Sequence, residues 1–167
     1  MGMIGAYKRL SAEQLQELLA SPETITDLLY PDDDEDDIAE DPSMIDIDKA
    51  WHGLHFLLNG DPWSGEGPLF SVVLGGTEIG EDLGYGPARY LTPEEVKETA
   101  AALDNVTDVE LRAKYDPAAF AAADIYPQIW GGDAAEALEY IMQSLTTVRA
   151  FFREAAEHGE AVLLYMM

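Results

Sequence analysis

The sequence of 167 residues contains no cysteine, and this absence excludes several kinds of chemistry. Without thiols the chain forms no disulfide and offers no thiolate nucleophile, iron–sulfur ligand or cysteine ligand for zinc. Long apolar runs are missing too, because none approaches the ~20 residues needed to cross a bilayer. The N-terminal MGMIGAYKRL lacks the apolar core of a signal peptide, and Ala6 stands where the myristoylation pattern requires serine or threonine. We therefore expect a cytoplasmic protein.

Basic residues are scarce: 9 lysines and arginines stand against 33 aspartates and glutamates, which gives a net charge of −24. Such a charge repels DNA, RNA and anionic membrane surfaces, because binding phosphates requires lysine and arginine to replace counterions. It suits a basic protein partner or divalent cations, although a salt-adapted proteome would also explain it. Hydrophobic residues make up 47%, an ordinary proportion for a folded protein, so we predict one domain over 1–167.

Several catalytic motifs are absent as well. The segment GYGPAR (Gly84–Arg89) resembles the start of a dinucleotide-binding turn, but it lacks the third glycine and Pro87 precedes a predicted strand. No serine lies in a G-x-S-x-G motif, and His158 lacks the HExxH pattern of zinc proteases. These absences argue against nucleotide hydrolases, dehydrogenases, α/β-hydrolases and zincins, and no cofactor is predicted.

The pattern of apolar residues predicts a mixed α+β domain, in which a small central sheet is flanked by helices. Strands are expected at three places: 3–10, 88–91 and 161–167. Capping boxes predict helix starts at Ser11 with Gln14 and at Thr92 with Glu95. The clearest element is one C-terminal helix of roughly 24 residues within 133–159, which has an apolar stripe and is followed by the final strand.

Two segments look irregular. The run PDDDEDDIAEDP (31–42) has eight acidic residues and no basic one, so we expect a solvated acidic loop within the domain. It does not fit a calcium loop, because Asp37 replaces the turn glycine and Ser43 the closing glutamate. The segment 60–90 contains eight of the 14 glycines and reads as loop, a kind of region that is often functional.

The stretch DIDKAWHGLHFLLNG (46–60) carries two histidines on a predicted helix. Asp46 or Asp48 is expected to cap the start, and Gly60 to end it. The spacing places His55 on an apolar face with the residues Trp51, Leu54 and Leu58. His52 is expected at the edge of that face, where a cleft or solvent reaches it.

The histidines allow a functional and a structural interpretation. Asp48, His52 and His55 share a face and are candidate metal ligands, or His55 is a general base oriented by a carboxylate. We favour the structural interpretation and predict no metal, since metal sites normally have further ligands and outer support. Arg89 and Tyr90 complete the candidate pocket, although Arg89 is expected to pair with a carboxylate in so acidic a chain. The tryptophans Trp51, Trp63 and Trp130 are candidates to line a pocket, but the core is the expected place for aromatic residues.

Five segments together resemble one known family. They are MGMIG, DIDKAWHGLHFLL, ARYLTPEEV, DIYPQIW and EALEYI…VRAFFREAAEHGEAVLLYM, and they extend over nearly the whole chain in the right order. The sequence is similar to the bacterial YfbM-like family of domains of unknown function. The resemblance implies a single α/β domain, bacterial and cytosolic, and it implies no activity and no catalytic residue.

Two functions remain open. The first is a non-catalytic, acidic interaction protein that recognises a basic protein partner, and we favour it because the usual catalytic motifs are missing. The second is a small-molecule enzyme or binding protein with a pocket between the His52/His55 helix and the glycine-rich region 60–90. Whether His55 opens onto a cleft or is sealed in the core distinguishes them.

Overall fold

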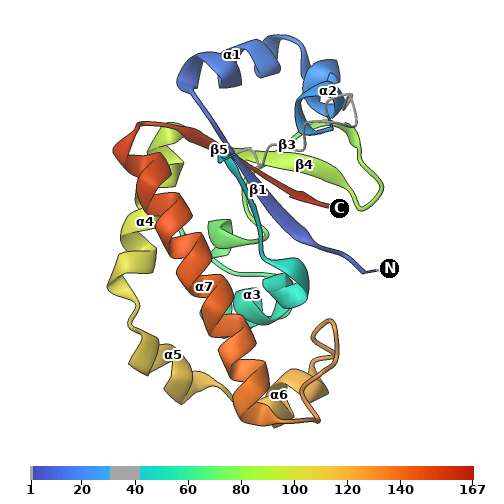
Figure 1. Cartoon of the computed structure of the whole chain (residues 1–167), viewed down its shortest axis with the longest axis vertical. Coiled ribbons are helices and arrows are strands. Elements are labelled where there is room, and N and C mark those ends of the chain that lie inside the picture. The colour runs from blue at the N-terminus through green and yellow to red at the C-terminus, as the bar shows by residue number, and fades with distance from the viewer. Residues whose placement is uncertain (1, 31–41) are drawn as a thin grey trace.

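The computed structural model describes residues 2–30 and 42–167, which form one antiparallel sheet with helices on both faces (Figure 1). The strands lie in the order β2-β1-β5-β4-β3, so β5, the last in the chain, is the middle strand. Their bounds are β1 (Gly5–Leu10), β2 (Met44–Asp46), β3 (Thr77–Asp82), β4 (Pro87–Leu91) and β5 (Ala161–Met166). This is the mixed α+β fold with a long C-terminal helix that the sequence predicts.

Seven α-helices and three 3₁₀ turns lie within the described residues. The helices are α1 (Ala12–Ala20), α2 (Ile25–Leu29), α3 (Trp51–Asn59), α4 (Pro93–Asn105), α5 (Asp108–Lys114), α6 (Pro117–Ala122) and α7 (Ala134–Glu157). The 3₁₀ turns are η1 (Pro22–Thr24), η2 (Asp48–Ala50) and η3 (Phe70–Val72). None of these helices combines the length and the apolar character that a membrane crossing requires.

The predicted helix ends are largely confirmed. Both capping boxes are present, Ser11 with Gln14 at α1 and Thr92 with Glu95 at α4. Helix α7 has the expected 24 residues, and the Asp133 side chain accepts hydrogen bonds from N–H groups of its first turn. The acidic segment 31–41 lies outside the described residues.

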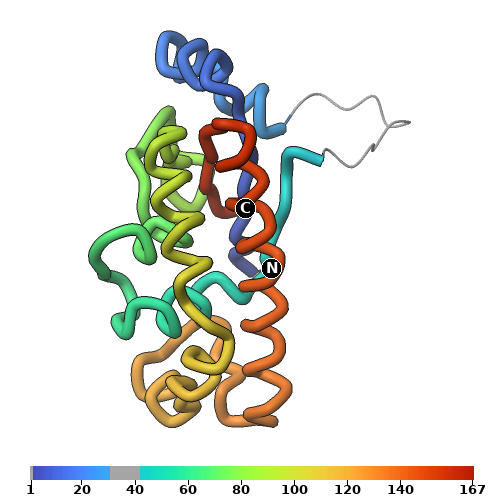
Figure 2. The backbone as a smooth tube through the Cα atoms, turned by 90° about the vertical axis from the view of Figure 1, so that its left-hand side faces the viewer, coloured from blue at the N-terminus to red at the C-terminus, as the bar shows by residue number. Residues whose placement is uncertain are grey.

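The sheet separates two apolar cores because side chains alternate along each strand. Helices α1 and α2 cover one face, while α3, α4 and α7 cover the other (Figure 1). On the α1–α2 side the buried residues are Ala6, Leu10, Leu15, Leu18, Ile25, Leu29, Ile79, Ala88, Ala161, Leu163 and Tyr165. The larger core, on the α7 side, contains the stripe Ile141, Leu145, Val148 and Phe152. Figure 2 shows α4 and α7 running side by side on this side of the molecule.

Two predictions about local structure are wrong. Part of the segment expected as loop forms β3, an edge strand in which only Ile79 is buried, so its sequence lacks the alternation that marks a strand. Helix α3 begins at Trp51, after η2, and no side chain caps it. Asp48 instead has a φ of 50° and its carboxylate binds Tyr140. The end at Gly60 is as expected, with a φ of 73°.

Candidate functional site

Both histidines of α3 lie in the protein interior. The exposed fraction is 0% for His55 and 1% for His52. The burial of His55 agrees with the helical spacing. The expectation that His52 reaches a cleft or solvent is wrong, because the segment after α3 folds back over this face and the Trp63 ring covers the imidazole at a centroid distance of 4.3 Å.

His52 is held by two backbone groups from different parts of the chain. Its Nε2 lies 2.8 Å from the carbonyl oxygen of Pro62, and its Nδ1 accepts a hydrogen bond of 2.8 Å from the N–H of Tyr126. A carbonyl can only accept and an N–H can only donate, so the ring is the neutral tautomer with its proton on Nε2. Burial lowers the pKa of His52, against the opposing effect of the Pro62 carbonyl.

His55, one turn later, also has a partner at each ring nitrogen, but one of them is a side chain of its own helix. Its Nε2 lies 3.2 Å from the carbonyl oxygen of Ser64, and its Nδ1 lies 3.3 Å from the side-chain nitrogen of Asn59. Burial lowers its pKa too, and the Ser64 carbonyl opposes the shift. The two rings therefore fasten the segment 60–65, here called the tryptophan loop, to α3.

The other predicted site residues lie elsewhere. The Asp48 carboxylate accepts a hydrogen bond of 2.7 Å from the Tyr140 hydroxyl. Arg89 and Tyr90 are neighbours on β4 and point to opposite faces of the sheet, which prevents them from sharing a site. Arg89 donates to the carbonyls of Val73 and Gly75, and in the described part of the chain no carboxylate forms the expected ion pair with it. Nor do residues 2–30 and 42–167 contain a group of three or more metal-ligand side chains.

The tryptophan loop presents one large aromatic side chain to solvent. Trp63 is 62% exposed, so its expected place in the core is wrong. Its backbone is held by Asp61, whose Oδ1 accepts hydrogen bonds from the N–H groups of Trp63 and Ser64 at 2.9 and 2.8 Å. These bonds lower the pKa of Asp61. The backbone of Trp63 is therefore held in place, and its ring lies against His52 while most of it stays exposed.

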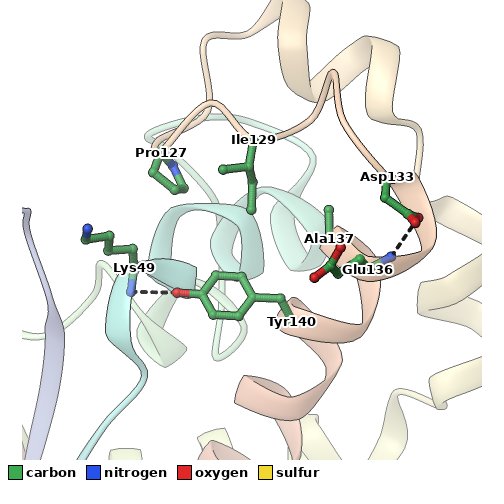
Figure 3. Close-up of a pocket in the computed structure, with 7 residues that line it drawn as sticks. All are labelled: Lys49, Pro127, Ile129, Asp133, Glu136, Ala137 and Tyr140. Carbon is green, nitrogen blue, oxygen red and sulfur yellow. Dashed lines mark hydrogen bonds between the residues drawn. The ribbon is translucent and has the colours of Figure 1, made fainter.

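A pocket of about 490 Å³ lies between η2, the segment 127–133 and the start of α7 (Figure 3). We call it the Tyr140 pocket. Its lining residues are Lys49, Pro127, Ile129, Asp133, Glu136, Ala137 and Tyr140. The volume falls in the range of ~300–1,000 Å³ that is usual for small-molecule sites. Sequence analysis missed this pocket because its walls come from three separated segments that carry no common motif.

The hydroxyl group of Tyr140 both donates and accepts a hydrogen bond. Its hydroxyl donates to Asp48 and accepts a hydrogen bond of 3.0 Å from the backbone N–H of Lys49. Burial, followed by the hydrogen bond to Asp48, raises the pKa of Tyr140 to about 12. The phenol therefore stays neutral at physiological pH and acts as a fixed wall of the pocket.

The backbone is unusual on two sides of the Tyr140 pocket. Asp48 and Gln128 have φ values of 50° and 65°, in the left-handed region. That region costs a residue other than glycine roughly 1–2 kcal/mol, less for aspartate. Each is next to lining residues: Asp48 precedes Lys49, and Gln128 lies between Pro127 and Ile129. Two of the three described non-glycine residues with positive φ thus adjoin the pocket, and the third, Asp124, follows α6.

Three charged side chains line the Tyr140 pocket, and the Asp48 carboxylate lies beside it on the Tyr140 hydroxyl. Figure 3 shows Lys49 on one side of the Tyr140 ring, and Asp133 and Glu136 on the other. One oxygen of Asp133 is used to cap α7. Within the described ranges, Lys49 and Glu136 form no ion pair, either with each other or with a third residue.

Comparisons with known proteins agree over the whole length. Residues 1–165 match the model of the family described as "Domain of unknown function (DUF1877)". Protein YfbM of Escherichia coli strain K12 is 28% identical over 170 residues, which covers 98% of this chain and 97% of that protein. The crystal structure of YfbM, described there as a protein of unknown function, matches with a TM-score of 0.76 and 25% identity, covering 98% and 99% of the two chains. The chain therefore belongs to the DUF1877 family, the YfbM-like family that its sequence resembles.

Proposed function

We propose that this protein is a non-catalytic interaction module that recognises a basic partner protein, with Trp63 as its anchor. The observation that carries the proposal is an exposed tryptophan, with its backbone held by Asp61 and its ring against His52, on a chain with a net charge of −24. Tryptophan is among the residues that contribute most to binding in protein interfaces. Its face attracts lysine and arginine side chains, and surrounding negative charge steers them toward it.

The arginines are paired within the fold and not free to bind a partner. Four of the five arginines form ion pairs within the fold, and the fifth, Arg89, binds backbone carbonyls. The pairs join Arg9 to Glu154 and Glu160, Arg112 to Glu139, Arg149 to Asp108, and Arg153 to Asp104. The five arginines are thus held by groups of this chain, and the 33 acidic residues far outnumber them, which favours a basic partner.

The state of the histidines supports a role without catalysis. A general base needs a free lone pair within reach of a substrate. In both His52 and His55 the lone pair on Nδ1 already accepts a hydrogen bond, and the Nε2–H is given to a carbonyl. Their role is to position the tryptophan loop, and with it Trp63.

The test uses a synthetic peptide of alternating arginine and serine, titrated calorimetrically into the protein at low and at physiological salt. Binding should weaken roughly tenfold in Trp63→Ala. It should change little in the matched control Tyr85→Ala, which removes another exposed aromatic ring at 50% exposure. A peptide with citrulline in place of arginine keeps the shape without the charge, and it should not bind. Equal loss of affinity in both variants, or no binding of the arginine peptide, would contradict the proposal.

A further inference from the structure

We propose that Asn59 is a site of spontaneous chemical modification, in which the Gly60 nitrogen attacks the side-chain amide of Asn59, and that the native contacts of the tryptophan loop hold this reaction back. Asn59 and Gly60 form the one Asn-Gly pair in the sequence. The inference does not depend on the proposed function, because it concerns the chemistry of an amide and not the binding of a partner to Trp63.

The reaction follows from the chemistry of the two residues. The backbone nitrogen of Gly60 loses its proton to a base in the solvent and forms a bond with Cγ of Asn59, which closes a five-membered succinimide ring. The bond between Cγ and Nδ2 breaks, and Nδ2 takes up a proton and leaves as ammonia. Water then opens the ring at either carbonyl, which yields aspartate or isoaspartate. Glycine has no side chain to hinder the attack, so this pair is the favourable one.

The native structure holds both reacting groups. Nδ2 of Asn59 lies 3.1 and 3.2 Å from the carbonyl oxygens of His55 and Leu69, and 3.3 Å from Nδ1 of His55. The N–H of Gly60 donates a hydrogen bond of 2.8 Å to the carbonyl of Phe56. Ring closure requires Asn59 to leave the helical ψ of about −42° and its amide to leave these partners. The intact end of α3 therefore keeps the two groups from reacting.

The tryptophan loop packs against the same amide. A Cβ atom added at Gly65 would lie 2.5 Å from Oδ1 of Asn59, which is shorter than an ordinary contact, so the Gly65 backbone lies close to this oxygen. Asn59 is also the last residue of α3, and helix ends fray. A local opening of the tryptophan loop and the end of α3 thus frees the amide without unfolding of the sheet or α7.

The product cannot restore the native contacts. An aspartate at position 59 carries acceptor oxygens only, and these would face the carbonyls of His55 and Leu69. Isoaspartate places an additional methylene group in the backbone and interrupts the end of α3. The modification is therefore a one-way step that adds a negative charge and removes the amide that connects α3 to Leu69.

The test follows the modification of the intact protein by peptide mass spectrometry, in native buffer and in urea at the same mildly alkaline pH. Asn59 should convert at least about tenfold faster in urea than in the native protein, because the native reaction requires an opening that costs free energy. Asn105 is an internal control, since it too is the last residue of its helix but precedes Val106. In urea it should convert at least about tenfold more slowly than Asn59, because a β-branched side chain hinders the attack.

A pair of matched variants tests the role of the tryptophan loop. Gly65→Ala displaces the Asn59 amide and should raise the native rate at Asn59 about threefold or more by favouring local opening. Gly131→Ala, where an added Cβ meets no atom within 4 Å, should leave that rate unchanged. Circular dichroism checks that both variants are folded, and in urea all three proteins should react alike.

Three outcomes would overturn the inference. They are equal rates at Asn59 in the native protein and in urea, equal rates at Asn59 and Asn105 in urea, and a native rate that is the same in folded Gly65→Ala as in the unaltered protein. The comparison of native buffer with urea uses the unaltered chain, so it decides the matter even if Gly65→Ala does not fold. None of these results bears on the arginine peptide and Trp63.

Discussion

His52 and Tyr126 are 74 positions apart in the chain and are joined by a hydrogen bond of 2.8 Å from the Tyr126 N–H to Nδ1 of the ring. Because Nε2 binds the Pro62 carbonyl, one imidazole connects α3, the tryptophan loop and the segment that leads into the Tyr140 pocket. If Nδ1 of His52 also carried a proton, this N–H group would face the N–H group of Tyr126, and neither could accept a hydrogen bond. This junction therefore requires a neutral ring.

The first prediction concerns pH. Burial lowers the pKa of His52 and His55 in the folded state, so below pH ~6.5 the unfolded chain binds protons that the folded protein does not. The free energy of unfolding should consequently fall as the pH drops below 6.5, by at most about 1.4 kcal/mol per histidine and pH unit. Above pH ~7.5 these two groups should contribute no pH dependence. Urea denaturation between pH 5.5 and 8 measures this, and a stability that rises toward pH 5.5 would contradict it.

The second prediction compares the stability effects of replacing the two buried histidines and the exposed His158. His52→Ala and His55→Ala should each reduce the free energy of unfolding by about 2–4 kcal/mol, since each removes a buried ring and leaves buried polar groups unpaired. His158→Ala, at an exposed position after α7, should change it by less than about 1 kcal/mol. Denaturation midpoints in urea provide the comparison. An unchanged midpoint in His52→Ala would show that the tryptophan loop does not depend on this residue.

The third prediction tests the core. Leu145 is completely buried in the stripe of α7, and Leu145→Ala should destabilise the protein by about 2–5 kcal/mol through lost apolar burial and a cavity. Gln143→Ala, on the exposed side of the same helix, should cost less than about 0.5 kcal/mol. The same small effect in both variants would rule out a core position for the stripe.

The fourth prediction concerns salt. With a net charge of −24, repulsion among carboxylates disfavours the compact state, and salt screens it with a Debye length near ~10 Å at 0.1 M. Salt also weakens the three pairs of Arg112, Arg149 and Arg153, in each of which the carboxylate is about half exposed, but such pairs contribute only about 0–1 kcal/mol each. The melting temperature should therefore rise between a few millimolar and several hundred millimolar NaCl. A flat or falling melting temperature would mean that the ion pairs outweigh the repulsion.

The sequence predicted those parts of the fold that local chemistry determines. The capping boxes at Ser11 and Thr92 and the length of α7 follow from residues within one helix, and the structure confirms them. Strand β3 was missed because an edge strand needs little apolar surface, and its residues TEIGED look like loop. Strand β2 has only three residues and leaves no periodic pattern.

The candidate site depended on contacts that local patterns do not encode. Helical spacing correctly placed His55 inside but left His52 at an edge, because spacing cannot reveal that Trp63 folds back over that edge. Asp133 and Glu136 were recognisable only as the start of a helix, and nothing in the sequence joined them to Lys49. The pocket arises from tertiary packing of three segments.

The central position of β5 has a consequence for biosynthesis. Gly5 pairs with Met166, so β1 must wait for residues made more than 150 positions later before it gains its main partner. At a synthesis rate of roughly 5–20 residues per second, this delay is on the order of 10–30 seconds. During that time β1 and the β3–β4 hairpin each expose an unpaired edge on the ribosome, where it invites aggregation or chaperone binding. Both edges gain their partner only when β5 is available to pair between them.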